Sequence, residues 1–260
     1  MNKQLQTRYS AFIANNADLA AIAPIKLKLL DTGGGNTKVK KSEKDSVGRR
    51  FAGLSLKPSK ALCPGSGAAG CLDNCLDQSG RGVFPNVADG RYFKQQLFLR
   101  DRELFDDILR YELENFQRLC ERQGVIATVR LNVLSDVDWL YIIEAFPGIS
   151  FYDYTKIASR TRKQLPDNYK LIFSYSARKQ YAKAVSIAWN TDKPIAVVFR
   201  SDKFPAYFNG RRVINGDAND WINANSGPVV VGLKAKGAAA KRDTSGFVID
   251  VADDVIAMGV

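Results

Sequence analysis

The sequence predicts an α/β protein with a mainly parallel six-stranded sheet, expected to form a partial (β/α) barrel that follows an N-terminal extension. Two observations predict this fold class. After residue 50, short apolar stretches rich in β-branched and aromatic residues alternate with stretches of helical periodicity. The apolar stretches show little polar alternation, which is typical of strands that helices cover on both faces and therefore of a parallel sheet.

Six stretches are the expected strands, and they start at Phe51, Ile126, Ile149, Lys170, Ile195 and Val229. The clearest helix spans Arg102–Arg122, where apolar residues recur at intervals of three and four, and Gly124 ends it. Shorter helices are expected at 139–146 and 177–189. The strand–helix alternation fits an open sheet or a partial barrel.

The chain is divided into an extension, residues 1–50, and an α/β domain, residues 51–260. Within the extension we expect a helix over 10–23 and a short strand over 25–30. The glycine-rich segment 33–38 is expected to form a turn.

The composition favours a polyanionic partner. The chain has 38 Lys and Arg against 27 Asp and Glu, a net charge of +11, while 45% hydrophobic and 25% charged residues are ordinary for a globular protein. Such a surplus attracts nucleic acid or nucleotides by releasing condensed counterions, although a basic surface can also serve solubility alone. With neither a membrane-length apolar run nor a signal peptide, the expected location is the cytoplasm, without a membrane partner.

The absence of histidine restricts the chemistry. With no histidine in 260 residues, a Ser–His–Asp triad, a Cys–His pair and a His-ligated zinc site are excluded. Any catalysis must come from Asp, Glu, Lys, Tyr, Cys or a cofactor.

Cys63, Cys71 and Cys75 lie in one 13-residue loop that is rich in glycine and follows the first apolar strand. Glycine allows the tight turns and exposed backbone amides that a metal–sulfur centre needs. We expect a 4Fe–4S cluster rather than zinc, because zinc usually takes four ligands in two close pairs. Three free buried thiols or a redox pair are the alternatives. The fourth cysteine, Cys120, falls on the apolar stripe of the long helix and is expected to be buried.

Polar side chains gather where the expected strands end. Because parallel strands bring their carboxyl ends to one edge of a sheet, we expect these side chains to share a site. We assign catalytic roles to Asp136, Tyr154 and Lys156. Cofactor binding is assigned to Asp136, Ser174, Lys234 and Lys236.

Basic residues are interleaved with aromatic ones after the third strand. Lys156, Arg160, Arg162 and Lys163 are therefore predicted to contact nucleic acid by neutralising phosphates beside stacking rings. The alternative is that the aromatic residues belong to the core. Farther along, Asp217 and Asp220 could form a cation-binding turn, but their spacing is also that of a capped turn.

The chain resembles the phage proteins known as gene product 88. The stretches that carry the resemblance are Gly35–Lys38, Phe51–Leu56 with the Cys63 loop, Val129–Asp136, Phe151–Lys156, Leu165–Asn168, Gly216–Asp217 and Gly232–Gly237. They follow one another along nearly the whole chain. The resemblance implies a protein of phages, prophages or plasmids and does not supply an activity.

A looser similarity of layout concerns radical S-adenosylmethionine enzymes. Those enzymes place three cysteines after the first strand of a partial six-stranded barrel, and the open iron of the cluster binds the methionine moiety. The order here is similar, although seven and three residues separate the cysteines. The resemblance implies that S-adenosylmethionine is a candidate cofactor and that Asp136 accepts its ammonium group.

The leading hypothesis is thus a phage iron–sulfur protein of radical S-adenosylmethionine type that acts on or with nucleic acid or a nucleotide. The alternative is a non-enzymatic DNA-binding or replication accessory protein whose cysteine loop holds structural zinc. A phage factor that binds a host protein is the third hypothesis. Whether the protein is an enzyme stays open at this point.

Overall fold

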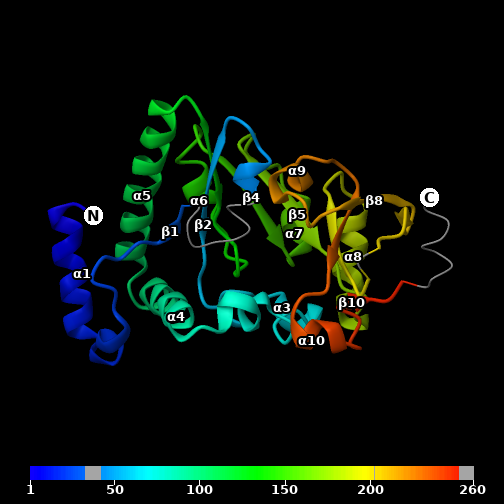
Figure 1. The fold of residues 1–260 in the computed structure, drawn as a ribbon, viewed down its shortest axis with the longest axis horizontal. Coiled ribbons are helices and arrows are strands. Elements are labelled where there is room, and N and C mark those ends of the chain that lie inside the picture. The colour runs from blue at the N-terminus through cyan, green and yellow to red at the C-terminus, as the bar shows by residue number, and fades with distance from the viewer. Residues whose placement is uncertain (33–41, 202, 252–260) are drawn as a thin grey trace.

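A computed structural model describes residues 1–32, 42–201 and 203–251. Its centre is a mixed α/β arrangement with a mostly parallel sheet that does not close (Figure 1). Ten strands lie in the described part of the chain: β1 (Leu30–Asp31), β2 (Arg49–Leu54), β3 (Ile126–Arg130), β4 (Ser150–Thr155), β5 (Tyr169–Ser174), β6 (Ile195–Phe199), β7 (Tyr207–Phe208), β8 (Arg211–Asn215), β9 (Val230–Lys234) and β10 (Val248–Ile249).

The α-helices of the described residues are α1 (Lys3–Asn15), α3 (Ser66–Ala69), α4 (Pro85–Arg100), α5 (Arg102–Arg122), α6 (Leu140–Ile143), α7 (Ala158–Thr161), α8 (Ala182–Trp189), α9 (Asp220–Ala224) and α10 (Gly237–Arg242). Short 3₁₀ helices cover Ala17–Ile22, Leu76–Gln78, Gly80–Val83 and Lys179–Tyr181. No helix of the described ranges is both long and apolar enough to cross a bilayer.

The strand order is β1-β2-β3-β4-β5-β6-β9-β8-β7, and β10 pairs with β6 beyond this path. The six predicted strands correspond to β2, β3, β4, β5, β6 and β9, and each pairs in parallel with the next. The prediction of six strands is wrong in number, because β1, β7, β8 and β10 extend the sheet. Two of these strands, β1 and β7, pair antiparallel with their neighbours.

Several predicted boundaries also need correction. The helices expected over 139–146 and 177–189 are shorter and correspond to α6 (Leu140–Ile143) and α8 (Ala182–Trp189). The helix expected over 10–23 is α1 followed by a 3₁₀ turn, and the strand expected over 25–30 is reduced to β1 at its end. The predicted turn at 33–38 lies outside the described residues.

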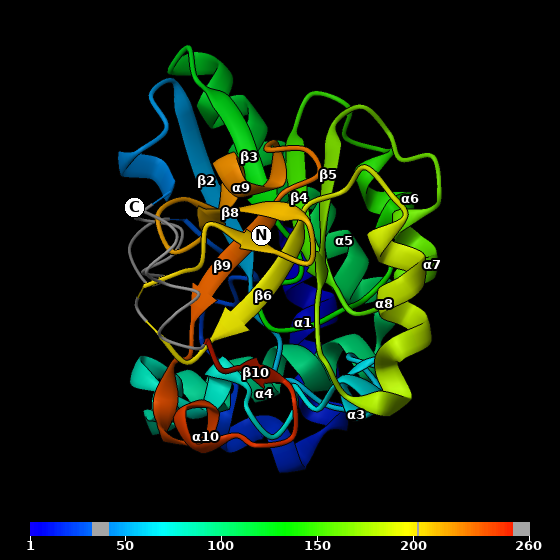
Figure 2. The same cartoon turned by 90° about the vertical axis from the view of Figure 1, so that its right-hand side faces the viewer.

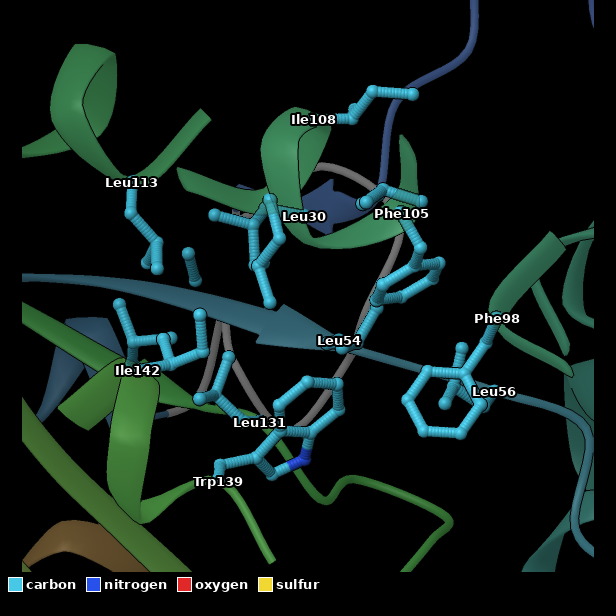
Figure 3. Close-up of a cluster of buried hydrophobic side chains, with 14 of the residues drawn as sticks. Leu30, Leu54, Leu56, Phe98, Phe105, Ile108, Leu113, Leu131, Trp139 and Ile142 are labelled. Atoms are coloured by element: carbon cyan, nitrogen blue, oxygen red, sulfur yellow. The ribbon is translucent and has the colours of Figure 1, made fainter. Parts of the chain in front are cut away.

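Helix α5 forms where the apolar stripe predicts it. Asp101 caps its first turn by accepting a 2.9 Å hydrogen bond from the amide of Leu104, and Gly124, with a φ of 63°, follows its end. The stripe packs into the core that β2 and the turn after β3 also line, where Phe105 lies beside Leu54, and Ile108 and Leu131 belong to the same buried cluster (Figure 3). Cys120 is buried on this stripe, which confirms its predicted place in the core.

The N-terminal segment shares this core. Tyr9 and Phe12 of α1 make edge-to-face contacts with Phe93 of α4 at 6.0 and 6.3 Å between ring centroids. In Figure 1, α1 and α5 stand beside the β1 edge of the sheet, and β8 lies toward the opposite edge.

A layer of helices faces the carboxyl ends of the parallel strands. Figure 2 shows β6 and β9 running toward α10, with α3 and α4 in the same lower layer. The cysteine loop, which contains α3, belongs to this layer. The fold therefore places the cysteines opposite the strand ends.

Candidate functional site

The carboxyl ends of β3, β4, β5, β6 and β9 open into a cavity of about 210 Å³. The cysteine loop supplies another part of its lining with Cys63, Cys71 and Cys75. Six residues predicted from the strand ends also line it, namely Asp136, Tyr154, Lys156, Ser174, Lys234 and Lys236. The structure thus brings both predicted sets to one cavity, while the roles assigned to them remain predictions.

Local backbone contacts shape the cysteine loop. The amide of Cys63 donates to the carbonyl of Ser59 at 2.8 Å, and the amide of Ser66 donates to the carbonyl of Cys63 at 3.0 Å. The loop then packs tightly on the end of β4, where a Cβ added at Gly65 would lie 2.7 Å from Cβ of Lys156. Glycine at position 65 therefore permits the close approach of loop and strand.

The three thiols are unpaired by disulfides and partly accessible. Burial raises the pKa of each, and that of Cys63 reaches about 12. The neighbouring Lys156 ammonium opposes this rise at Cys71. Cys71 and Cys75 also raise the pKa of Cys63, and Cys71 raises that of Cys75. They are therefore close enough to interact across the cavity.

A single metal ion does not fit the thiols as they lie. Within residues 1–32, 42–201 and 203–251, no three Cys, Asp or Glu side chains form a group that could hold one ion. A four-iron cluster has a different requirement, since each cysteine binds its own iron at a separate corner.

Asp136 is the anchor of the cavity wall. Its carboxylate accepts hydrogen bonds from the Thr155 hydroxyl at 2.8 Å and the Lys156 amide at 2.7 Å. The Arg160 guanidinium adds an ion pair at 2.7 Å. Burial raises the pKa of Asp136, and these donors oppose the rise. The carboxylate thus joins the turn after β3 to the end of β4.

Lys156 points between the cysteine loop and the ends of two strands. Its Nζ donates to the carbonyls of Ser174 and Tyr175, at 3.1 Å each, and lies 4.8 Å from the ring centroid of Phe247. Burial lowers the pKa of Lys156 to about 8, against opposing effects of Cys71 and Asp136. The cavity wall therefore contains a buried ammonium group that two backbone carbonyls hold in place.

Ser66 adds an unsatisfied polar group. The residue is 1% exposed and lines the cavity. Its Oγ is the one buried side-chain N or O atom among the described residues that lacks a hydrogen-bond partner. Such atoms are rare because an unmade hydrogen bond in the interior costs about 1–3 kcal/mol.

The sequence interpretation missed a buried ion pair at this site. Arg130 Nη1 lies 2.9 Å from Oδ2 of Asp220, and the Tyr154 hydroxyl donates to Oδ1 of Asp220 at 3.0 Å. The guanidinium also lies 4.5 Å from the ring centroid of Tyr154. An arginine inside an otherwise apolar strand was the signal that could have revealed the pair.

Asn132 was missed as well, although it organises the turn that carries Asp136. Its side-chain oxygen accepts from the Ser135 hydroxyl, the Val137 amide and the Trp139 indole at 2.9, 2.9 and 3.2 Å. The backbone amide of Asn132 donates to the Asp153 carboxylate at 2.7 Å. No sequence pattern distinguishes this asparagine from one in an ordinary loop.

The acidic turn is a capped turn with both carboxylates engaged. Asn219 caps α9 by accepting from the amides of Trp221 and Ile222 at 2.9 and 3.2 Å. Asp220 pairs with Arg130, while Asp217 accepts from the Lys234 amide at 2.9 Å and pairs with Lys236. The contacts therefore hold the end of β9 rather than outline a cation site.

The four residues predicted to contact nucleic acid do not lie on one surface. Lys156 and Arg160 face inward, toward the strand ends and Asp136. Arg162 and Lys163 are exposed, and Lys163 lies 3.9 Å from Asp138. The four residues do not form one exposed stripe.

No curated protein and no solved structure matches this chain. A family described as Gene product 88 matches residues 27–251, which is most of the sequence. The chain belongs to the Gene product 88 family.

Proposed function

We propose that this chain is an iron–sulfur protein in which Cys63, Cys71 and Cys75 hold a 4Fe–4S cluster beside a ligand cavity. The observation that carries the proposal is the shared lining: the three thiols face the same 210 Å³ cavity as six polar residues from the strand ends. In parallel α/β sheets, ligands bind at the carboxyl ends of the strands. The site therefore combines a sulfur ligand set with a substrate-sized space.

The finer fold assignment supports the same proposal. Strands β2 to β6 follow one another in space in the order of the sequence, without a reversal. This one-directional winding is that of a partial (β/α) barrel, although the sheet stays open. We propose that the cavity is the mouth of such a barrel and that the cysteine loop covers it.

The roles of the residues follow from their contacts. A bound cluster with three protein ligands supplies one iron that can coordinate a small molecule, for which S-adenosylmethionine is the candidate. Lys156 lies where its positive charge stabilises the Cys71 thiolate, and Asp136 fixes the backbone of Lys156. Tyr154, Ser174, Lys234 and Lys236 line the remaining wall toward a substrate.

Asp136 acts in this proposal mainly as a positioning residue. Three protein groups already donate to its carboxylate. An incoming ammonium group, as the radical S-adenosylmethionine hypothesis requires, has to share that carboxylate with them. The proposed substrate is a nucleotide or nucleic acid, which the net charge of +11 favours.

Metal and sulfide analysis of protein purified without oxygen tests the proposal. We expect brown protein with about four irons and four sulfides per chain, as a cysteine-ligated cluster requires. Cys71→Ala should remove most of the iron, while the matched control Cys120→Ala, in the core and outside the cavity lining, should retain it. Addition of S-adenosylmethionine should change the spectrum of the reduced cluster.

The other outcomes separate the hypotheses. Colourless protein with about one zinc would favour the accessory-protein alternative with a structural metal loop. Iron without any response to S-adenosylmethionine would retain the cluster and remove the radical mechanism. Anaerobic protein with neither iron nor zinc, or full iron content in Cys71→Ala, would overturn the proposal.

A further inference from the structure

A second pocket adjoins the cysteine cavity on the side of α4. Its volume is about 510 Å³, and it shares Leu76, Val133, Leu134 and Lys236 with the lining of the first. Ser79, which lies between the two 3₁₀ helices before α4, approaches Gly237 at the start of α10. A Cβ added at Gly237 would lie 3.0 Å from Cβ of Ser79. We call the two adjoining pockets the trough.

The lining of the trough is strongly basic. Seven cationic side chains line it: Arg81, Arg91, Lys94, Arg130, Lys156, Lys234 and Lys236. Three carboxylates oppose them, those of Asp31, Asp136 and Asp217. Behind the lining, Asp77 and Asp220 pair with Arg91 and Arg130, so the trough retains a surplus of two positive charges, and low-dielectric walls strengthen the resulting field.

Internal contacts hold several of these cations in place. Arg91 pairs with the buried Asp77 at 2.7 Å, and Lys94 donates to the carbonyl of Leu29 at 2.9 Å. Lys236 pairs with Asp217. Arg81 and Lys234 are exposed and make no ion pair with any residue of the described ranges. Fixed cations thus line the trough, and two uncompensated ones stand at its rim.

The inner part of the trough has a different character. Tyr154, Tyr175 and Phe247 contribute aromatic side chains to the cavity, and the unsatisfied hydroxyl of Ser66 lies among them. A buried hydroxyl without a protein partner can bond to a ligand or a water in the cavity. The inner part therefore suits an organic body with a polar edge.

We infer that the trough binds a phosphorylated small molecule, with its organic body in the cysteine cavity and its phosphoryl groups at Arg81, Lys234 and Lys236. This inference extends the proposed function by naming a ligand class and rests on the same cavity, but it does not require the cluster. It also moves the anion site away from Arg162 and Lys163, which lie outside both linings.

Calorimetric titration of the full chain with ATP, at low and at moderate salt, tests the inference. We expect binding that weakens as salt rises, and no detectable binding of adenosine, which lacks the phosphoryl groups. Arg81→Glu and Lys234→Glu should each weaken ATP binding by about tenfold or more, because each reverses a charge at the rim. The matched controls Arg162→Glu and Lys163→Glu should leave the affinity within about twofold.

Three results would overturn the inference. They are the absence of ATP binding at low salt, equal losses in rim and control variants, and adenosine binding as tight as that of ATP. A single-stranded oligonucleotide is the second probe. If it binds, depends on Arg162 and Lys163 and ignores Arg81 and Lys234, the anion site is not the trough. Circular dichroism melting checks that each variant is folded.

The same titration separates this inference from the proposed function. A variant with Cys63, Cys71 and Cys75 all changed to Ala cannot hold the cluster but keeps every cation of the trough. ATP binding by this variant supports the trough even if no iron is found in the unmodified chain. Conversely, iron without ATP binding would leave the cluster proposal intact and reject the ligand class.

Discussion

The backbone amide of Lys156 donates a 2.7 Å hydrogen bond to Oδ2 of Asp136, so that the end of β4 is tied to the turn after β3. Oδ1 of the same carboxylate receives the Thr155 hydroxyl and Arg160. One side chain thereby fixes the relative position of two strand ends at the cavity. The stability of the site should depend strongly on it.

Changing Asp136 to Ala should lower the free energy of unfolding by about 3 kcal/mol, because Arg160 and the Lys156 amide lose a buried acceptor. Urea denaturation of both proteins measures the difference. Asp167→Ala is the control, since Asp167 is exposed, and should change the stability by at most about 0.5 kcal/mol. Equal effects of the two variants would show that Asp136 is not an anchor.

Asp153 should make stability depend on pH. Burial raises its pKa from 3.8 to about 7. Between these values the folded chain retains a proton that the unfolded chain releases, so the free energy of unfolding falls as pH rises from about 4 to 7. This one group contributes a slope of at most about 1.4 kcal/mol per pH unit.

Asp153→Asn removes this titration and should flatten the slope, whatever its effect on absolute stability. Denaturation curves at several pH values between 4 and 7 provide the measurement. The exposed Asp89→Asn serves as the control and should preserve the slope. An unchanged slope in Asp153→Asn would mean that other groups cause the pH dependence.

The pair of Arg130 and Asp220 should show strong coupling, because both side chains are buried and 2.9 Å apart. Arg130→Met takes the cation from a buried carboxylate and should cost about 3 kcal/mol or more. The double variant Arg130→Met with Asp220→Asn should lose less than the sum of the single losses. Urea denaturation of the four proteins completes the cycle, and strictly additive losses would contradict the coupling.

Alanine substitutions at two glycines, one before α4 and one within it, should change the stability of the protein in opposite directions. A Cβ at Gly82 would lie 2.3 Å from the carbonyl oxygen of Asp77, whereas one at Gly90 meets nothing within 4 Å. Gly82→Ala should therefore destabilise the protein by about 1–3 kcal/mol. Gly90→Ala lies inside a helix and should stabilise it by about 0.5–1 kcal/mol. Thermal melting of both variants decides whether the signs are opposite.

The parallel core of the sheet could be predicted from the sequence because its strands are apolar on both faces. Helix α4 could not, since its buried residues include Gln95 beside Phe93 and Leu97 and give no clean apolar stripe. The two-residue strands β1, β7 and β10 are too short for periodicity to register. Their positions depend on pairing with neighbouring strands of the sheet rather than on a local sequence pattern.

At the site, residues that no sequence motif connects could still be placed together, because parallel strands bring their carboxyl ends to one edge of a sheet. Tyr154 and Ser174 lie at the ends of β4 and β5, Asp136 lies in the turn after β3, and the parallel arrangement brings all three to one cavity. This topological rule says nothing about side-chain partners. Asn132 and Asp220 acquire their roles through hydrogen bonds that depend on how a turn and a short helix pack, and a linear pattern does not encode that packing.

The two ends of the strand order have a consequence for self-association. The outermost strands, β1 (Leu30–Asp31) and β7 (Tyr207–Phe208), are only two residues long and run antiparallel to the strands they cover. A long exposed edge presents free amide and carbonyl groups that recruit strands of other molecules, and a two-residue edge offers too few for stable addition. These short antiparallel borders should therefore disfavour the addition of strands from other molecules to the parallel core.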